Sequence, residues 1–409
     1  MTKTLRNVIA LCGPNLKVTP GCTVKIDRGR FSSIGVKVEP SSGEVYDAAG
    51  FILIPGLINA HVHIGDAAAK DRAAGLSLED FVDPWRGVKH KVLTSTPPKD
   101  LIRAMRDAVD DMLRCGITTF ADFREGGLAG IRLLRSALAG SRIRCIKLGR
   151  PNHYFTRTNV VKRKTQLPRE AYEELDATLG VCEGLGLSGP NEFTDASLGE
   201  MRQLVESTGK IAAIHAAEAR STVEFSTRTF GKTEVERAVQ KLRPQILVHL
   251  THASARDLSL ADKAGCSVVC CPRANAALRV GIPPIEEMLK RGLNVALGTD
   301  NVMVTGPDLF REMDYTLRTI QAHSSVAIPP REILKMITIN AARALRIDNL
   351  LGSVDVGKRA DAVVLKTDSL NMRPVNDIYA SIVHRARPED IAAVISEGEV
   401  VWGELSNLA

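Results

Sequence analysis

The sequence predicts an α/β fold, a (β/α)8 barrel with a small β-sandwich domain that both chain termini form. In the middle of the chain, apolar strand candidates alternate with amphipathic helices. Near both ends, short β-type runs are broken by turn residues. We therefore expect the first part of the sandwich at 1–52, the barrel at 53–350 and the second part at 351–409. A doubly wound sheet would show the same alternation, and periodicity alone does not separate the two folds.

The predicted elements fill this plan in order. The clearest helix spans 98–114, with one apolar face and Gly116 as its stop. Ser254 can cap a later helix, because Asp257 follows three residues on. Near the ends, β-type runs are expected at 16–18, 22–26, 31–36, 362–365 and 391–402. The eight predicted barrel strands are 54–63, 118–123, 144–149, 186–189, 211–215, 246–250, 267–271 and 294–298.

Composition narrows the classes of function. The 409 residues carry a formal net charge of +7 with a pI of about 9.0, but Lys and Arg are scattered and aromatic residues make up only 4%. Nucleic-acid binders gather such charge into a stripe or use aromatic stacking platforms, so we expect no nucleic-acid partner. No apolar run is long enough for a signal peptide or a membrane span, so we expect a cytoplasmic protein without a membrane partner. The eight cysteines lack the paired spacing of a structural zinc site, and we expect reduced thiols.

Polar residues occur where the predicted barrel strands end, which is where a (β/α)8 barrel carries its functional groups. His61 and His63 are two apart on the first strand, so both imidazoles project to the same side. His215 ends the fifth strand and Asp300 follows the eighth. Three histidines and one aspartate form a donor set that suits zinc, with iron(II) as the alternative.

Two more residues are candidates for chemistry. Glu218 follows His215 by three residues, and a carboxylate there could move a proton between water and a leaving group. His249 lies in the sixth strand and could polarise the substrate or orient the attacking water, whereas His252 is expected at the rim.

These motifs resemble a known family. The segments that carry the resemblance are Gly56-Leu-Ile-Asn-Ala-His-Val-His63, His215-Ala-Ala-Glu218, Val248-His249, Cys271-Pro272-Arg-Ala-Asn275, Ala296-Leu-Gly-Thr-Asp300 and the stretch 352–365. In this order they resemble the cytosine deaminase-like and chlorohydrolase-like branch of the amidohydrolase superfamily, over nearly the whole chain.

The resemblance implies one divalent metal ion, held by His61, His63, His215 and Asp300. It implies catalytic roles for Glu218, His249 and Asp300, with Asp300 helping to deprotonate the attacking water. The implied reaction is hydrolytic deamination of an amino-substituted heterocycle, purine-, pyrimidine- or triazine-like, by attack of a metal-bound hydroxide. The basic surface could attract a substrate that bears an anionic group. Family analogy also suggests a homodimer.

Two alternatives stay open. A cyclic amide hydrolase, resembling imidazolonepropionase or hydantoinase, would use the same metal and water to open a ring C–N bond. A barrel that binds metal but has lost catalysis could act as an interaction module, although such a site would have little use for both Glu218 and His249.

The loops after the third and fourth strands are expected to contact the substrate. Their polar candidates are Arg150, Asn152, His153 and Asn191. A second metal ion would need a bridging lysine, and Lys147 lies two residues before its strand ends, so a salt bridge is the favoured interpretation for Lys147.

Overall fold

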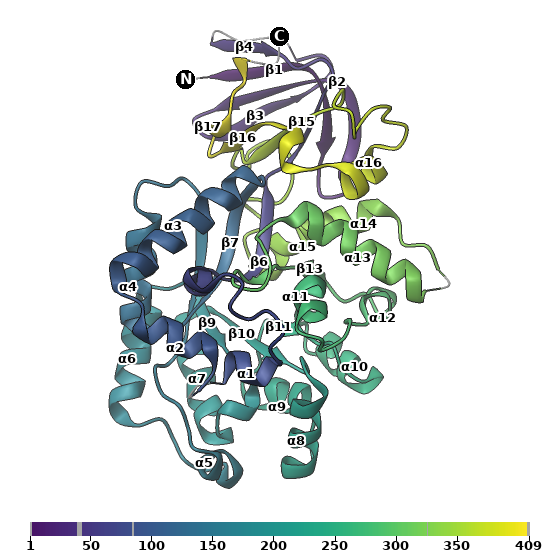
Figure 1. Ribbon diagram of the computed structural model, residues 1–409. Coiled ribbons are helices and arrows are strands. Elements are labelled where there is room, and N and C mark those ends of the chain that lie inside the picture. The colour runs from purple at the N-terminus through teal and green to yellow at the C-terminus, as the bar shows by residue number, and fades with distance from the viewer. Residues whose placement is uncertain (1, 39–42, 84–85, 325, 407–409) are drawn as a thin grey trace.

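Two sheets organise the computed structural model, which describes residues 2–38, 43–83, 86–324 and 326–406 (Figure 1). The larger sheet has the hydrogen-bonded order β13-β12-β11-β10-β9-β8-β7-β6-β14 among these residues, and every neighbouring pair is parallel. Its strands are β6 (Leu57–His63), β7 (Ile117–Arg124), β8 (Arg144–Gly149), β9 (Gly184–Leu187), β10 (Ile211–Ala216), β11 (Ile246–His249), β12 (Ser267–Cys270), β13 (Val295–Leu297) and β14 (Asp300–Asn301).

The eighth barrel strand is split into β13 and β14, and the split closes the ring. β13 pairs with β12, whereas β14 pairs with β6 on the other side. Gly298 lies between the two halves, where a Cβ atom would approach the His61 carbonyl oxygen to 2.6 Å. A glycine is therefore needed for the eighth strand to pass so close to the first.

The eight predicted strands all occur, with shifts of at most three residues at their ends. The first one divides at Gly56. Its early part is β5 (Phe51–Pro55), which belongs to the terminal sheet, and its later part is β6. The predicted (β/α)8 barrel is confirmed.

Helices cover the outside of the barrel (Figure 1). The predicted helix at 98–114 is α3, and Ser254 caps α10 in a capping box with Asp257, as its spacing predicts. The helices are α1 (Leu78–Val82), α2 (Val88–Ser95), α3 (Pro98–Arg114), α4 (Gly127–Leu138), α5 (Arg157–Lys162), α6 (Arg169–Gly180), α7 (Asp195–Thr208), α8 (Arg220–Phe230), α9 (Glu234–Lys241), α10 (Ala255–Lys263), α11 (Pro272–Ala277), α12 (Ile285–Lys290), α13 (Leu309–His323), α14 (Pro330–Met336), α15 (Ile339–Ala344) and α16 (Ile378–Arg385).

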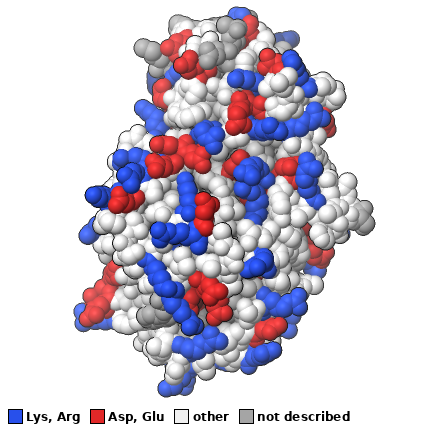
Figure 2. Space-filling view, in the orientation of Figure 1, with Lys and Arg blue, Asp and Glu red and all other residues white. Residues whose placement is uncertain are grey.

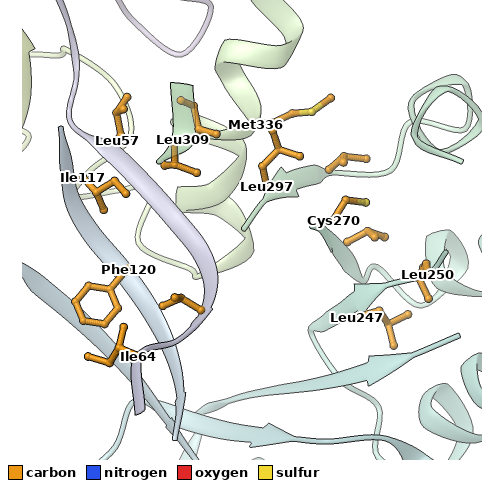
Figure 3. Close-up of a cluster of buried hydrophobic side chains, with 14 of the residues drawn as sticks. Leu57, Ile64, Ile117, Phe120, Leu247, Leu250, Cys270, Leu297, Leu309 and Met336 are labelled. Carbon is orange, nitrogen blue, oxygen red and sulfur yellow. The ribbon is translucent and has the colours of Figure 1, made fainter. Parts of the chain in front are cut away.

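Alternation along the strands separates two apolar layers. On β10, Ile211 and Ala213 face the barrel interior, while Ala212 and Ile214 join the layer between strands and helices. Figure 3 shows part of this outer layer, where Leu247 of β11 lies among side chains from other strands and helices. The rigid, filled barrel holds the strand ends in fixed positions.

Both termini build the second sheet. Its order is β17-β16-β15-β5-β1-β2-β3, with β4 paired to β1, and it surrounds a separate apolar core. Its strands are β1 (Lys3–Cys12), β2 (Lys17–Asp27), β3 (Arg30–Gly35), β4 (Glu44–Asp47), β5, β15 (Ala362–Lys366), β16 (Ile391–Ser396) and β17 (Glu399–Gly403). The predicted β domain from both chain ends is confirmed, and its boundaries at residues 52 and 350 stay a prediction.

The surface charge and the helix lengths agree with the expectations from composition. Figure 2 shows basic and acidic side chains interspersed over the visible face, as the scattered charges in the sequence suggest. None of the helices in the described parts of the chain combines the length and the apolar character needed to cross a bilayer.

Candidate metal centre and active site

Three strand ends, those of β6, β10 and β14, bring the four predicted ligands together, and the end of β11 places His249 beside them. The ligand atoms of His61, His63 and His215 lie within 4.8 Å of one another, and so do those of His61, His249 and Asp300. The closest approaches are His61 Nε2 to Asp300 Oδ1 at 3.2 Å and His63 Nε2 to His215 Nε2 at 3.4 Å. Residues that are far apart in the sequence therefore form a compact group of donor atoms at one end of the barrel.

The first strand presents its histidines through a local irregularity. Ile58 and Ala60 face the interior, so strict alternation would turn His61 and His63 outward. The register between β6 and β7 shifts between Asn59 and Val62, and the two imidazoles join the interior cluster, with the His61 ring 4.3 Å from the Phe123 ring. Bulges of this kind re-aim side chains beside functional sites.

Backbone carbonyls fix which ring nitrogens can bind a metal. His63 Nδ1 lies 3.1 Å from the Phe123 oxygen, and His215 Nδ1 lies 2.7 Å from the Leu187 oxygen. A carbonyl only accepts, so each Nδ1 must carry the proton and each neutral Nε2 a lone pair. The two lone pairs then face each other across 3.4 Å, which is repulsive unless an electrophile lies between them. A divalent metal ion fits this arrangement.

Burial keeps these ligands in the protonation states that a metal needs. It lowers the pKa of His61 to about 3 and that of His215 well below its usual value, with the neighbouring histidines adding to the effect. Burial alone would raise the pKa of the Asp300 carboxyl, but the hydrogen bond with His61 and the neighbouring imidazoles outweigh it and hold the pKa below its ordinary range. His61 and His215 are therefore neutral imidazoles, and Asp300 is an ionised carboxylate.

Glu218 and His249 stand beside this cluster. Glu218 Oε2 lies 3.6 Å from His249 Nε2, and burial raises the pKa of Glu218. The Asn275 amide nitrogen lies 3.2 Å from His249 Nδ1, so a neutral His249 ring carries its proton on Nε2, facing Glu218. His252 instead donates from Nε2 to the Val280 oxygen at 2.6 Å, away from the cluster.

The backbone is strained where these residues occur. Ala217, His249, Leu250 and Asp300 have φ values of 51°, 73°, 52° and 59°, in the left-handed region that non-glycine residues avoid. Each such residue costs about 1–2 kcal/mol. Strict alternation along β11 would turn His249 to the outer face, where Leu247 lies. The left-handed backbone at His249 breaks this alternation, and the His249 ring lies 5.3 Å from the His215 ring.

A charged network that sequence reasoning missed supports His63. Glu125 Oε1 lies 3.1 Å from His63 Nδ1, and Lys89 Nζ lies 2.6 Å from the same oxygen. Lys89 also lies 3.6 Å from Asp66, whose oxygens accept from Asn301 Nδ2 and the Met303 amide. The network thus joins the loop after the first strand to the loop that follows Asp300. Glu125 directly follows β7, and that position was the available signal in the sequence.

The four predicted substrate contacts lie in different surroundings. Arg150 and Asn152 line a cavity of about 210 Å³ that Lys89 and Glu125 also line. His153 packs edge-on against Phe155 at 4.6 Å. The Asn191 side chain donates to the Thr222 oxygen and to Glu234, and accepts from Arg237, so its amide is occupied by the protein itself.

Lys147 lies apart from the metal ligands. Its neighbours Ile146 and Leu148 face the barrel interior, so Lys147 points outward and its Nζ pairs with Glu183 Oε1 at 2.9 Å. The salt bridge favoured from the sequence is therefore present, and Lys147 is not a bridging ligand in this arrangement.

Comparisons with known proteins bear on the whole chain. The family model described as "Amidohydrolase family" matches residues 52–401. A "Putative aminohydrolase" of Methanothermobacter thermautotrophicus is 39% identical over 398 residues, which cover 97% of this chain and 98% of that protein. A 5-methylthioadenosine/S-adenosylhomocysteine deaminase of Thermoanaerobacter pseudethanolicus is 28% identical over 381 residues, or 87% of this chain and 83% of that protein.

The solved structures support the fold. An adenosine deaminase from Xanthomonas campestris, crystallised with bound zinc, superimposes with a TM-score of 0.85 at 20% identity, over 100% of this chain and 95% of that chain. With the family match and the 39% identical relative, the prediction from the motifs is confirmed: the chain belongs to the amidohydrolase family and is a hydrolase that acts on carbon–nitrogen bonds.

Proposed function

We propose that the protein is a metal-dependent hydrolytic deaminase that acts on an amino-substituted heterocycle and releases ammonia. The observation that carries the proposal is the half-buried Glu218 carboxylate, three residues after His215 and 3.6 Å from His249 Nε2. A site that only held a metal would not need this proton-carrying pair. The deaminases among the relatives support the reaction type and favour a purine-like ring, with pyrimidine- and triazine-like rings as the other members of the class.

We assign His61, His63, His215 and Asp300 to one divalent metal ion, with zinc as the first choice and iron(II) as the second. Three imidazole nitrogens and one carboxylate oxygen suit both ions and leave room for water. When bound, the metal supplies a Lewis acid that makes water nucleophilic near neutral pH.

The protein's own residues then move protons and hold the ring. Asp300 and Glu218 accept protons from the attacking water, whose oxygen adds to the ring carbon that bears the amino group. One of these protons goes to the ring nitrogen next to that carbon, whose C=N bond becomes single on attack, and the other goes by way of Glu218 to the amine. The C–N bond then breaks as the C=O bond forms, and ammonia leaves while the ring keeps the oxygen. His249 Nε2 carries a proton and is our candidate to hydrogen-bond the ring or the added oxygen.

We place the rest of the substrate in the 210 Å³ cavity. Glu125 lines this cavity and also hydrogen-bonds His63, so the cavity adjoins the cluster. Arg150 and Asn152 are our candidate contacts there. Lys89 also lines the cavity, and its cationic side chains suit a substituent that is polar or anionic. His153 and Asn191 remain weaker proposals, because neither lines this cavity.

An ammonia-release assay tests the function. The protein, purified from metal-supplemented medium, should release ammonia from at least one of adenine, adenosine, guanine, cytosine, pterin or triazine derivatives. Glu218→Gln, which keeps the size of the side chain, is the matched control and should retain its metal without releasing ammonia.

The same assay separates the alternatives. Turnover only of hydantoins or lactams, without ammonia, would establish a cyclic amide hydrolase. A protein that retains its metal but turns over neither panel would favour a non-catalytic barrel.

A further inference from the structure

The segment between His215 and Glu218 contains a strained residue. β10 ends at Ala216, and Ala217 follows with a φ of 51°. An alanine leaves this conformation readily unless its surroundings hold it there, because the Cβ crowds the backbone. If Ala217 relaxed, the direction of the chain would change one residue before Glu218.

Both backbone groups of Ala217 are held by hydrogen bonds. Its carbonyl accepts from the His252 amide at 2.8 Å. Its amide donates to Glu234 Oε2 at 3.1 Å. Glu234 begins α9 and is only 3% exposed, so a carboxylate from a distant helix reaches the turn through the protein interior.

The Glu234 carboxylate is itself fixed in place. Oε2 also accepts from the Thr222 hydroxyl at 2.6 Å, and Oε1 accepts from Asn191 Nδ2 at 3.0 Å. Asn191 in turn accepts from the guanidinium of Arg237 at 3.1 Å, and that guanidinium stacks on the Phe230 ring. Within the described parts of the chain, each hydrogen-bond partner of the Glu234 carboxylate is a neutral donor. The network ties the turn at Ala217, helix α8 and the short helix 190–192 to one carboxylate.

We propose that Glu234 is a positioning residue: it holds the left-handed turn at Ala217 so that Glu218 faces His249 and the metal ligands. The part of this proposal that concerns catalysis by Glu218 rests on the proposed function. The part that concerns the turn at Ala217 does not, because the turn can be observed without a substrate. It gives α9 a role in the reaction although none of its residues lines the proposed substrate cavity.

The test compares two substitutions of Glu234. Glu234→Leu removes both acceptor oxygens at similar size. Glu234→Gln keeps one oxygen, which can still accept from the Ala217 amide and the Thr222 hydroxyl. Glu236→Leu makes the same chemical change two residues along α9, where the side chain bonds Gln240 instead, and serves as the matched control.

Hydrogen–deuterium exchange of the peptide 211–222 is the first readout, measured on metal-loaded protein. Glu234→Leu should speed exchange in this peptide, while Glu234→Gln and Glu236→Leu should resemble the parent. Unchanged exchange in Glu234→Leu would overturn the proposal whether or not a substrate is known.

Turnover of a substrate from the ammonia assay is the second readout. Glu234→Leu should lower kcat by ~10-fold or more with little change in KM, because a small misplacement of a catalytic group costs rate. Adding Ala217→Gly should restore most of the loss, since glycine adopts the left-handed conformation without support. A merely structural role predicts no rescue, and that result would also overturn the proposal.

A milder substitution of Glu234 keeps the test possible if the first variant folds poorly. Should Glu234→Leu not fold, Glu234→Asp withdraws the carboxylate from Ala217 by one methylene and should give the same two changes at reduced size. Parental exchange and parental kcat in Glu234→Asp would count against the positioning role.

Discussion

Two buried glutamates support opposite sides of the candidate site, and they differ in charge. Glu125 supports His63 and is 7% exposed; Glu234 supports the turn before Glu218 and is 3% exposed. Burial raises the pKa of both, but Lys89 and His63 outweigh it at Glu125 and hold that pKa well below its usual value. At Glu234 the partners are neutral donors, and burial raises the pKa to about 7.

The difference shows that partners, and not depth, decide the charge of a buried carboxylate. On the His63 side, an ionised carboxylate beside the imidazole makes that ring a better metal ligand. On the Glu218 side, Glu234 is only partly ionised near pH 7 and accepts a hydrogen bond from the Ala217 amide. It therefore adds little negative charge beside Glu218, the proposed proton carrier. Glu125 is thus suited to strengthening metal binding, and Glu234 to fixing the position of Glu218.

The largest expected effects separate metal binding from proton transfer. His215→Ala should lose the metal and all activity, because it removes one of the facing Nε2 donors. Glu218→Gln should keep the metal and lose ~100-fold or more in turnover, which is the usual contribution of a general acid or base. Metal analysis beside the ammonia assay measures both. Activity of Glu218→Gln within ~10-fold of the parent would remove Glu218 from the proton path.

Glu125→Gln should weaken metal binding by ~10–100-fold, as the loss of a supporting carboxylate does elsewhere. The substitution keeps a hydrogen-bond acceptor for His63 but removes the charge and leaves Lys89 without its closest partner. Competition with a chelator gives the affinity. Glu183→Gln, at an exposed salt bridge on the outside of the barrel, is the control and should bind metal like the parent.

The pH dependence of stability should reveal the charge on Glu234. With a folded pKa of about 7, above the ordinary value of 4.5, the folded state binds the proton more tightly than the unfolded state. This contribution is fully present below about pH 4.5 and is lost as the pH rises through about 7. The Tm of the parent minus that of Glu234→Gln should therefore fall by ~2 °C or more between pH 5 and pH 8. A difference that stays flat would mean that Glu234 is already ionised at low pH.

The smallest expected effect is at Lys147. Elemental analysis should find one divalent ion per chain in the parent, and Lys147→Ala should leave that ratio unchanged, because Lys147 points away from the ligands toward Glu183. Two ions that persist through dialysis in the parent, and one in the variant, would contradict the mononuclear site.

Much of the fold follows from local patterns in the sequence. The barrel strands are continuous apolar runs, and buried parallel strands carry this signal wherever they occur. One strand of the terminal sheet, β1, which pairs with β2, β4 and β5, was not predicted. Its alternation is interrupted by register shifts around Val8 and by Asn7 with a φ of 61°, so no regular period of two remains in the sequence.

Some residues of the candidate site could likewise be predicted from the sequence, and others could not. His61, His63, His215 and Asp300 could be predicted because strand ends of a barrel meet in space. Lys89 and Glu234 could not, because each sits in a helix whose position depends on tertiary packing, and a glutamate at a helix start is common for local reasons. The turn of His249 into the interior depends on a reversal of the backbone that no pattern of residue types announces.

The junction at Gly56 has a consequence for how the chain is made. β5 and β6 are one strand that crosses from the terminal sheet into the barrel, and β5 pairs with β15, which is synthesised after all of the barrel strands. While the barrel strands are being synthesised, β5 can pair with β1 on one side, but its other edge still lacks β15. Such an edge can pair with other chains. β15, which is synthesised after the barrel strands, thus covers the edge of the strand that carries His61 and His63, two of the proposed metal ligands.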